Sequence, residues 1–199
     1  MNPTLSGMQI AILVTDGFEQ AEFTEPKAAF EREGAVTRVA SQKTGQVQGF
    51  KHDTKADRFD VDMTFKELDA KVFDAVLLPG GVMNADTIRM IPEAQAFVKD
   101  MQKQGKPIAV ICHGGWLLVS SGLVAGRTMT SWPTLQDDIR NAGGKWLDQE
   151  VVVDGNWVSS RKPDDIPAFN AKAIELMASY RKSGTEGTPD EEAVGLASS

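Results

Sequence analysis

The sequence lacks the features that define several common classes of protein. Its single cysteine, Cys112, excludes an internal disulfide, and nothing in the sequence suggests export. No apolar run approaches the roughly 20 residues that span a bilayer, and no basic region precedes the short apolar segment near the start. Basic residues are outnumbered, since 21 Lys and Arg face 28 Asp and Glu, and the net charge is −7. This balance argues against nucleic acid or an anionic membrane as the main partner, and we expect a cytoplasmic protein.

The distribution of apolar residues predicts an α/β fold. A chain of 199 residues, 41% hydrophobic, is expected to form a single domain over residues 8–182. Continuous apolar strands separated by helices indicate a mostly parallel sheet with helices on both faces. The expected strands cover residues 8–14, 36–41, 73–79 and 107–112, with a hairpin at 151–160 and helices that include 92–105 and a last one ending near Tyr180.

Two segments do not fit this pattern of strands and helices. Residues 45–62 are polar and predict an irregular segment that can hold a short hairpin. Residues 183–199 are acidic, small and aperiodic, which predicts a disordered tail.

The stretch AVICHGGWLL, residues 109–118, is the most informative in the chain. It predicts a buried strand, a sharp turn and a helix, with Cys112 at the turn, which is the arrangement of a nucleophile elbow. The helix amides and dipole favour thiolate over thiol, so we expect a reactive cysteine with a depressed pKa. The alternative is a buried and inert cysteine.

Glycines at the ends of two neighbouring strands supply candidate backbone donors. Gly80 and Gly81 follow one buried strand in a PGG motif, and Gly114 follows Cys112 in the elbow. We expect these strands to end at the same edge of the sheet, where ligands bind in such folds. The amides of Gly81 and His113 would then form a pair of donors for an oxyanion.

His113 and His52 are the only histidines, and we expect different roles for them. His113 is a candidate base, but neighbours on a tight turn rarely face each other. It can instead point sideways, toward an acid on another loop or subunit, or bond a backbone carbonyl. His52 lies in the polar stretch GFKHDTK and is expected to be a solvated loop residue.

Two early glutamates receive different interpretations. Asp16 and Glu19 have the spacing of a helix capping box, which gives Glu19 a structural role. Glu22 lies one turn further and reaches Cys112 if this helix abuts the elbow. Beside a thiolate, Glu22 must be protonated, so that it donates a hydrogen bond and relays a proton. The alternative is an ordinary solvated glutamate.

Four motifs together resemble the ThiJ/PfpI superfamily, and most closely its branch of PfpI-type intracellular proteases and general stress proteins. They are FEQAE after the first strand, PGG, ICHG in the elbow and SRKPDDIPAF near the end, and the similarity runs from about Met8 to Tyr180. The resemblance implies a flavodoxin-like three-layer sandwich of the class I glutamine amidotransferase type. It also implies that Cys112 is the nucleophile, Glu22 its hydrogen-bonded acid and His113 the histidine of a triad.

The resemblance further implies a homo-oligomer, either a dimer or a hexamer. In the protease branch the acid of the triad comes from the neighbouring subunit, at a loop that follows PGG, and Asp86 falls closest to that position. Glutamine amidotransferases themselves are excluded, because no histidine follows His113 to form their distant His-x-Glu. With one cysteine and two separated histidines, we expect neither a metal nor another cofactor.

The chain departs from the relatives at two aromatic positions. Elbows of the family often continue Cys-His-Gly-Pro-Gln, whereas Gly115 and Trp116 stand here. Trp132 stands where relatives of the protease branch have a tyrosine before proline. Both tryptophans change the lining of the pocket, which bears on the substrate and most of all on protease activity.

The leading functional hypothesis is a stress-associated, cysteine-dependent enzyme that acts on small dicarbonyls, their protein adducts or peptides. Such an enzyme would be a cofactor-independent glyoxalase, a deglycase or a peptidase. The alternative is a non-enzymatic redox sensor or holdase that works through oxidation of Cys112. Both need a reactive thiol, and the combination of elbow, PGG and His113 favours the enzyme.

Overall fold

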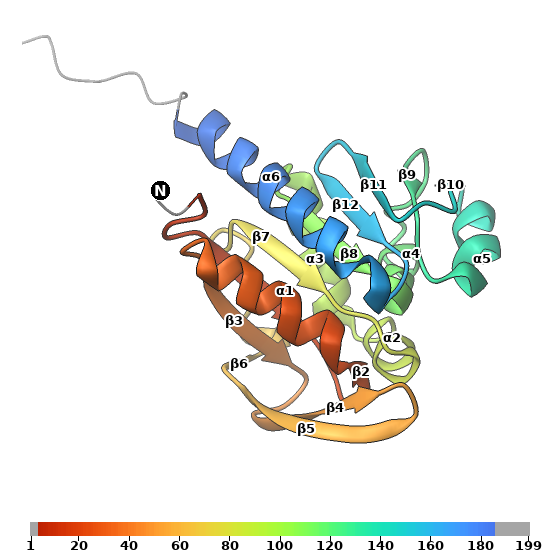
Figure 1. The fold of residues 1–199 in the computed structure, drawn as a ribbon, viewed down its shortest axis with the longest axis horizontal. Helices are drawn as coiled ribbons and strands as arrows, with labels where there is room; N and C mark the ends of the chain where they lie inside the picture. The colour runs from red at the N-terminus through yellow and green to blue at the C-terminus, as the bar shows by residue number, and fades with distance from the viewer. Residues whose placement is uncertain (1–3, 186–199) are drawn as a thin grey trace, which may run out of the picture.

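A computed structural model describes residues 4–185 and has a seven-stranded sheet at its centre (Figure 1). The strand order is β11-β12-β8-β7-β1-β3-β6, and only the edge strand β11 runs antiparallel to its neighbour. The strands are β1 (Gln9–Leu13), β3 (Val36–Ser41), β6 (Met63–Thr64), β7 (Ala75–Leu78), β8 (Ile108–Ile111), β11 (Val151–Asp154) and β12 (Trp157–Ser160). The mostly parallel sheet is as predicted.

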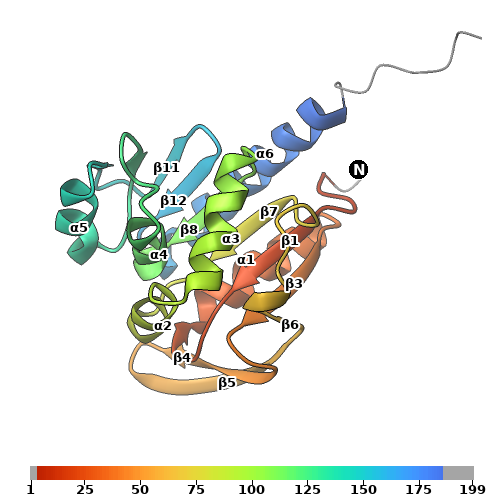
Figure 2. The same ribbon diagram turned by 180° about the vertical axis from the view of Figure 1, so that it is seen from behind.

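Helices cover both faces of this sheet, because its central strands are apolar on both sides. Every residue of β7 and β8 is buried. The helices α1 (Gln20–Arg32) and α6 (Ile166–Thr185) pack on one face (Figure 1). The helices α3 (Pro92–Lys103) and α4 (Gly115–Ser120) pack on the other (Figure 2). The result is the three-layer, flavodoxin-like sandwich that was expected.

The hairpin allowed for within residues 45–62 is present, but it fills almost the whole segment rather than being short and irregular. Strands β4 (Gly45–Lys51) and β5 (Thr54–Val61) form a long antiparallel hairpin there, which joins β2 (Phe18–Glu19) in a second sheet. The hairpin is held by an aromatic cluster rather than by a continuous apolar strand. Phe59 packs 5.8 Å from Phe18 and 4.9 Å from Phe23, measured between ring centroids.

Two helical segments also differ from the prediction. Helix α2 (Val82–Ile88) follows the PGG motif directly and was missed, because seven residues without a capping side chain give little periodic signal. Helix α6 extends to Thr185, so the first three residues of the predicted tail are helical. The rest of that tail, residues 186–199, lies outside the described residues.

The chain between α4 and β11 leaves the main sheet and carries two tryptophans, Trp132 and Trp146. It contains β9 (Thr128–Met129), α5 (Gln136–Asn141) and β10 (Lys145–Trp146), where β9 and β10 pair in a small sheet of their own. Among residues 4–185, no helix has the length and apolarity needed to cross a bilayer.

Replacement of Phe23 by alanine tests the aromatic cluster that anchors the hairpin. Phe23 is 1% exposed and lies 5.0 Å from Phe18 and 4.9 Å from Phe59. We expect Phe23→Ala to lower the free energy of unfolding by about 3–5 kcal/mol, measured by urea denaturation. The control Val72→Ala, at a residue that is 59% exposed, should change it by less than about 0.5 kcal/mol. Equal effects of the two substitutions would contradict the role of the cluster.

Candidate active site

The predicted elbow is present at the end of β8. Cys112 has φ of 60°, and His52 is the only other non-glycine residue of the described chain with positive φ. A short 3-10 turn over Cys112–Gly114 follows and leads into α4. A Cβ at Gly114 would lie 2.5 Å from the carbonyl oxygen of Leu78, so glycine is required for the turn to pass β7. The strained backbone at Cys112 is characteristic of a functional elbow.

Gly80 allows the acid and the thiol to approach each other. A Cβ on Gly80 would lie 2.6 Å from the Cβ of Cys112 and would also overlap the carboxyl of Glu22. The amide of Gly80 donates to Oε2 of Glu22 at 2.8 Å. Glycine is therefore required at position 80 of the PGG motif, because any side chain there would separate the elbow from α1.

Glu22 is completely buried in the first turn of α1, which excludes the alternative of a solvated glutamate. Burial raises the pKa of its carboxyl to about 8, against the opposing effects of the Cys112 thiol and the Gly80 amide. Its Oε1 atom has no hydrogen-bond partner among the described residues. Glu22 is therefore neutral at pH 7, and a proton on Oε1 is available to the neighbouring sulfur.

Cys112 is 7% exposed. The prediction that its thiol has a lowered pKa is wrong. Burial raises the pKa of the thiol, and a negative charge on Glu22 would raise it further. The amides of His113 and Gly81 act in the opposite direction, because both donate toward the sulfur. The prediction ranked the helix amides above burial, whereas the loss of water around the thiol has the larger effect here.

His113 faces its neighbour, contrary to the expectation that it would point sideways. Its Nδ1 atom lies 3.3 Å from the sulfur of Cys112. The left-handed backbone at Cys112 changes the direction of its side chain relative to the next one, which sequence spacing does not reveal. Burial lowers the pKa of His113, so that the neutral imidazole is favoured.

These groups open on a cavity of about 190 Å³ at the carboxyl edge of the sheet. Its lining residues are Glu19, Glu22, His52, Gly81, Val82, Cys112, His113, Trp132 and Pro163. A larger cavity of about 330 Å³ lies beside the ends of β1 and β3, but neither the thiol nor a histidine lines it. We place the site at the smaller cavity, where the titratable groups converge.

Glu19 and His52 are both placed differently from their predictions. Glu19 stands at the N-cap position of α1, but its side chain makes no capping hydrogen bond, so the predicted capping box is absent. Its carboxylate instead accepts the backbone amide of His52 at 2.9 Å. His52 is solvated, as expected, but it also lines the cavity, and this was missed because the sequence does not show where the hairpin that carries it packs.

Asp86 does not meet His113 within one chain. It lies exposed on α2 and makes no ion pair with the residues that the structure describes. Its predicted role needs a second subunit and stays a prediction. Nor do any three His, Cys, Asp or Glu side chains of residues 4–185 converge in a way that suits a metal ion.

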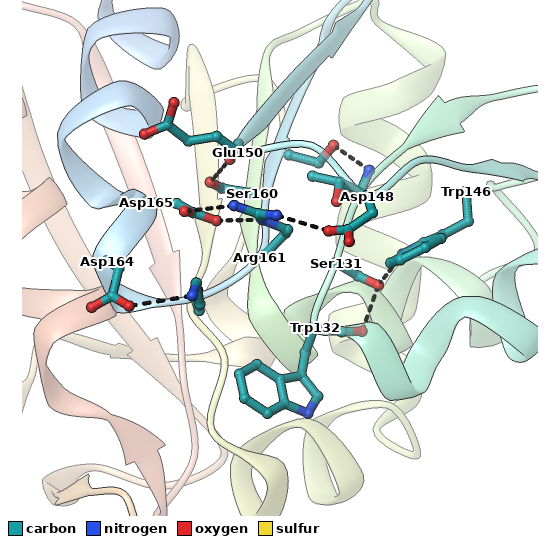
Figure 3. A network of polar contacts seen from close by, with 12 residues as sticks. Ser131, Trp132, Trp146, Asp148, Glu150, Ser160, Arg161, Asp164 and Asp165 are labelled. Atoms are coloured by element: carbon teal, nitrogen blue, oxygen red, sulfur yellow. Dashed lines mark hydrogen bonds and ion pairs between the residues drawn. The ribbon is translucent and has the colours of Figure 1, made fainter.

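The SRKPDDIPAF motif forms one wall of the cavity, and a polar network around Arg161 holds this segment in place (Figure 3). Arg161 donates to Asp165 at 2.8 Å and to Asp148 at 2.7 Å, and so ties the start of the last helix to the loop before β11. Pro163, which lines the cavity, lies between Arg161 and Asp165 in the sequence, and both are held by these bonds. The SRKPDDIPAF motif therefore shapes the site through an ion pair rather than through a reacting group.

Comparisons with known proteins agree with this geometry. The sequence profile of the DJ-1/PfpI family matches residues 8–176. The chain is 44% identical to a deglycase of Thermococcus kodakarensis over 85% of its own length and 99% of the relative. It is 36% identical to general stress protein 18 of Bacillus subtilis, over 86% and 98% of the two chains. Among solved structures, DJ-1 of Schizosaccharomyces pombe superposes with a TM-score of 0.75 at 26% identity, over 92% and 100% of the two chains.

The buried acid should make the stability of the protein depend on pH. Above its ordinary pKa of 4.5, Glu22 loses its proton in the unfolded chain, whereas the folded protein keeps it until about pH 8. The folded state therefore binds more protons in this window, and its stability should fall as the pH rises, by up to about 1.4 kcal/mol per pH unit. Glu22→Gln should remove this contribution, as measured by urea unfolding at pH 5, 6, 7 and 8. Parallel profiles for the two proteins would contradict a raised pKa at Glu22.

Alkylation of Cys112 across pH tests the effect of its surroundings on the thiol. We expect a midpoint above the roughly 8.5 of a free cysteine. Glu22→Gln should lower the midpoint, because it removes a negative charge and offers an amide donor to the thiolate. Glu19→Gln is the matched control, since Glu19 bonds the His52 amide instead, and it should shift the midpoint less. A wild-type midpoint below 8.5 would show that the amides outweigh burial.

Proposed function

Because the chain belongs to the DJ-1/PfpI family, we propose that it is a stress-associated, cysteine-dependent enzyme of the PfpI type that acts on small dicarbonyls and their adducts. The observation that carries this proposal is the convergence of four groups at one sulfur. The sulfur of Cys112 has the imidazole of His113 at 3.3 Å, the buried acid Glu22 beside it and two backbone amides directed at it. The cavity of about 190 Å³ favours a small substrate over an extended peptide.

The first step needs a base, because burial keeps Cys112 protonated at rest. As the sulfur bonds to the aldehyde carbon of a dicarbonyl, the thiol proton moves to Nδ1 of His113 and the carbonyl electrons move to oxygen. The amides of Gly81 and His113 stabilise the resulting oxyanion. The imidazolium then returns its proton to that oxygen, which gives a neutral hemithioacetal and restores the base.

Glu22 serves the next step as an acid, since its raised pKa keeps it protonated. The imidazole removes the proton from the former aldehyde carbon, and the electrons form an enediolate with the neighbouring carbonyl. Glu22 donates its proton to the second carbon, and the hydroxyl proton of the first carbon passes to the oxygen of the second, which leaves a thioester carbonyl and a neighbouring hydroxyl. The imidazolium then restores the proton of Glu22. The product is a thioester on Cys112, which water hydrolyses to a 2-hydroxy acid and the free thiol.

We further propose a homo-oligomer, either a dimer or a hexamer, with Asp86 near a contact between subunits. The support lies in the surface around Asp86, where three apolar side chains are exposed on α2 and just beyond it. Val82 is 53% exposed, Met83 47% and Met90 74%. Large apolar side chains grouped in this way are typical of an interaction surface. A cytoplasmic location fits the single free cysteine, which a reducing compartment preserves.

The alternative of a redox sensor is less well supported. Peroxide oxidises the thiolate, and burial raises the pKa of Cys112. The same burial limits access to the sulfur. An enzyme that supplies its own base does not need a thiolate at rest, so this environment suits turnover better than sensing.

Turnover of methylglyoxal tests the proposed function. The protein should form lactate, detected by NMR, and Cys112→Ser should abolish the reaction because a hydroxyl is a far weaker nucleophile. Glu22→Gln should lower turnover by about 100-fold or more, since it keeps a hydrogen bond but cannot transfer a proton. The surface variant Val72→Ala should match the wild type. Failure of the wild type both to form lactate and to release adducts from a methylglyoxal-treated peptide would overturn the proposal.

A further inference from the structure

His113 contacts two aromatic rings. The indole of Trp132 stacks on the imidazole with centroids 5.8 Å apart and planes inclined by 25°. The indole of Trp116 meets the imidazole at 5.4 Å and an angle of 63°. Both separations lie within the range of favourable aromatic contacts, and two such contacts restrict the rotation of the imidazole.

Trp132 is fixed by contacts that do not involve His113. Its backbone amide donates to the carbonyl of Cys112 at 3.3 Å, so its position follows that of the elbow itself. Its own carbonyl accepts the hydroxyl of Ser131 at 2.9 Å, and Ser131 accepts the indole N–H of Trp146 at 3.0 Å. The indole of Trp132 points away from this network (Figure 3), which leaves its face available to the imidazole.

Trp116 is fixed by contacts with residues other than His113. Its indole N–H donates to Asp138 at 2.8 Å, which sets the orientation of the ring. The guanidinium of Arg89 lies 4.9 Å from the ring centroid, in the position of a cation–π contact. Arg89 is itself held by a hydrogen bond of 2.9 Å to Ser120. The ring therefore has an anchor of its own, and His113 packs against an already ordered surface.

We propose that Trp116 and Trp132 are positioning residues, which clamp the His113 ring so that Nδ1 faces the sulfur of Cys112. His113 can then act as the base for the thiol of its own chain. This proposal rests on the proposed function, because it concerns the base of that reaction.

The clamp has a chemical consequence that can be observed without any substrate. A proton acceptor at Nδ1 requires the tautomer that carries its hydrogen on Nε2. Loss of a flanking ring frees the imidazole to rotate and exposes it to water. We therefore expect a mixture of tautomers in such a variant, together with a His113 pKa that returns toward the ordinary 6.5.

Nitrogen-15 NMR of histidine-labelled protein tests this arrangement in Trp132→Ala, Trp132→Phe and the wild type. The wild type should show one Nε2–H tautomer for His113, with a pKa below 6.5. Trp132→Ala should lose both properties and Trp132→Phe should retain them, because phenylalanine preserves a stacking ring. His52, whose side chain is 77% exposed, is an internal reference that should not change. A wild-type Nδ1–H tautomer, or a folded Trp132→Ala protein with an unchanged His113, would overturn the proposal.

Two further measurements separate the clamp from general stability and from the proposed activity. Trp157→Phe alters a tryptophan that is 1% exposed and does not line the site, so it should lower the melting temperature without moving the His113 signals. With methylglyoxal, Trp132→Ala should lower kcat by at least about tenfold, with rescue in Trp132→Phe. If the wild type turns over but the His113 signals of Trp132→Ala are unchanged, the clamp fails and the function stands. If the signals respond but the wild type has no activity, the function fails and the clamp stands.

Discussion

The close approach of three chain segments at Gly80 is the constraint on which the site depends. The loop after β7 passes between the elbow and the first turn of α1. Because Gly80 in this loop has no side chain, there is room for both segments. The Gly80 amide also donates to Glu22, so the same residue provides both the space and the bond that orients the acid. Similarly, Gly114 allows the elbow to pass the carbonyl of Leu78. Two glycines therefore bring together an acid and a thiol that lie ninety positions apart in the chain.

The same closeness determines the charge that the site can hold. A carboxylate and a thiolate cannot both be ionised in contact and away from water, and burial raises the pKa of each group. At neutral pH the site consequently holds its protons and stays uncharged. Reaction then consists of moving protons among sulfur, imidazole and carboxyl, with charge appearing only where the backbone amides can stabilise it. Burial thus explains both the pH dependence of stability and the need for a base beside the sulfur.

The sequence was sufficient to predict those parts of the molecule that depend on local pattern. Continuous apolar runs gave the parallel sheet, and the strand–turn–helix pattern around Cys112 gave the elbow, since each depends on a few adjacent residues. Contacts between distant segments were not predictable in the same way. The β4–β5 hairpin is held by Phe59 against α1, so His52 reached the cavity without a local signal. The pKa of Cys112 was misjudged for a related reason, because the nearby amides can be inferred from sequence whereas the surrounding burial cannot.

The orientation of His113 gives two tryptophans of the site a structural role. Two tryptophans in unexpected positions suggested only a changed pocket lining. In the fold, both contact one imidazole, and each has a further anchor: the backbone amide of Trp132 bonds the Cys112 carbonyl, and the indole of Trp116 bonds Asp138. Since a buried neutral thiol depends on its base, restricting that base to one orientation contributes directly to reactivity. The two tryptophans therefore act on the geometry of the proton acceptor, while the glycines act on the approach of the acid to the thiol.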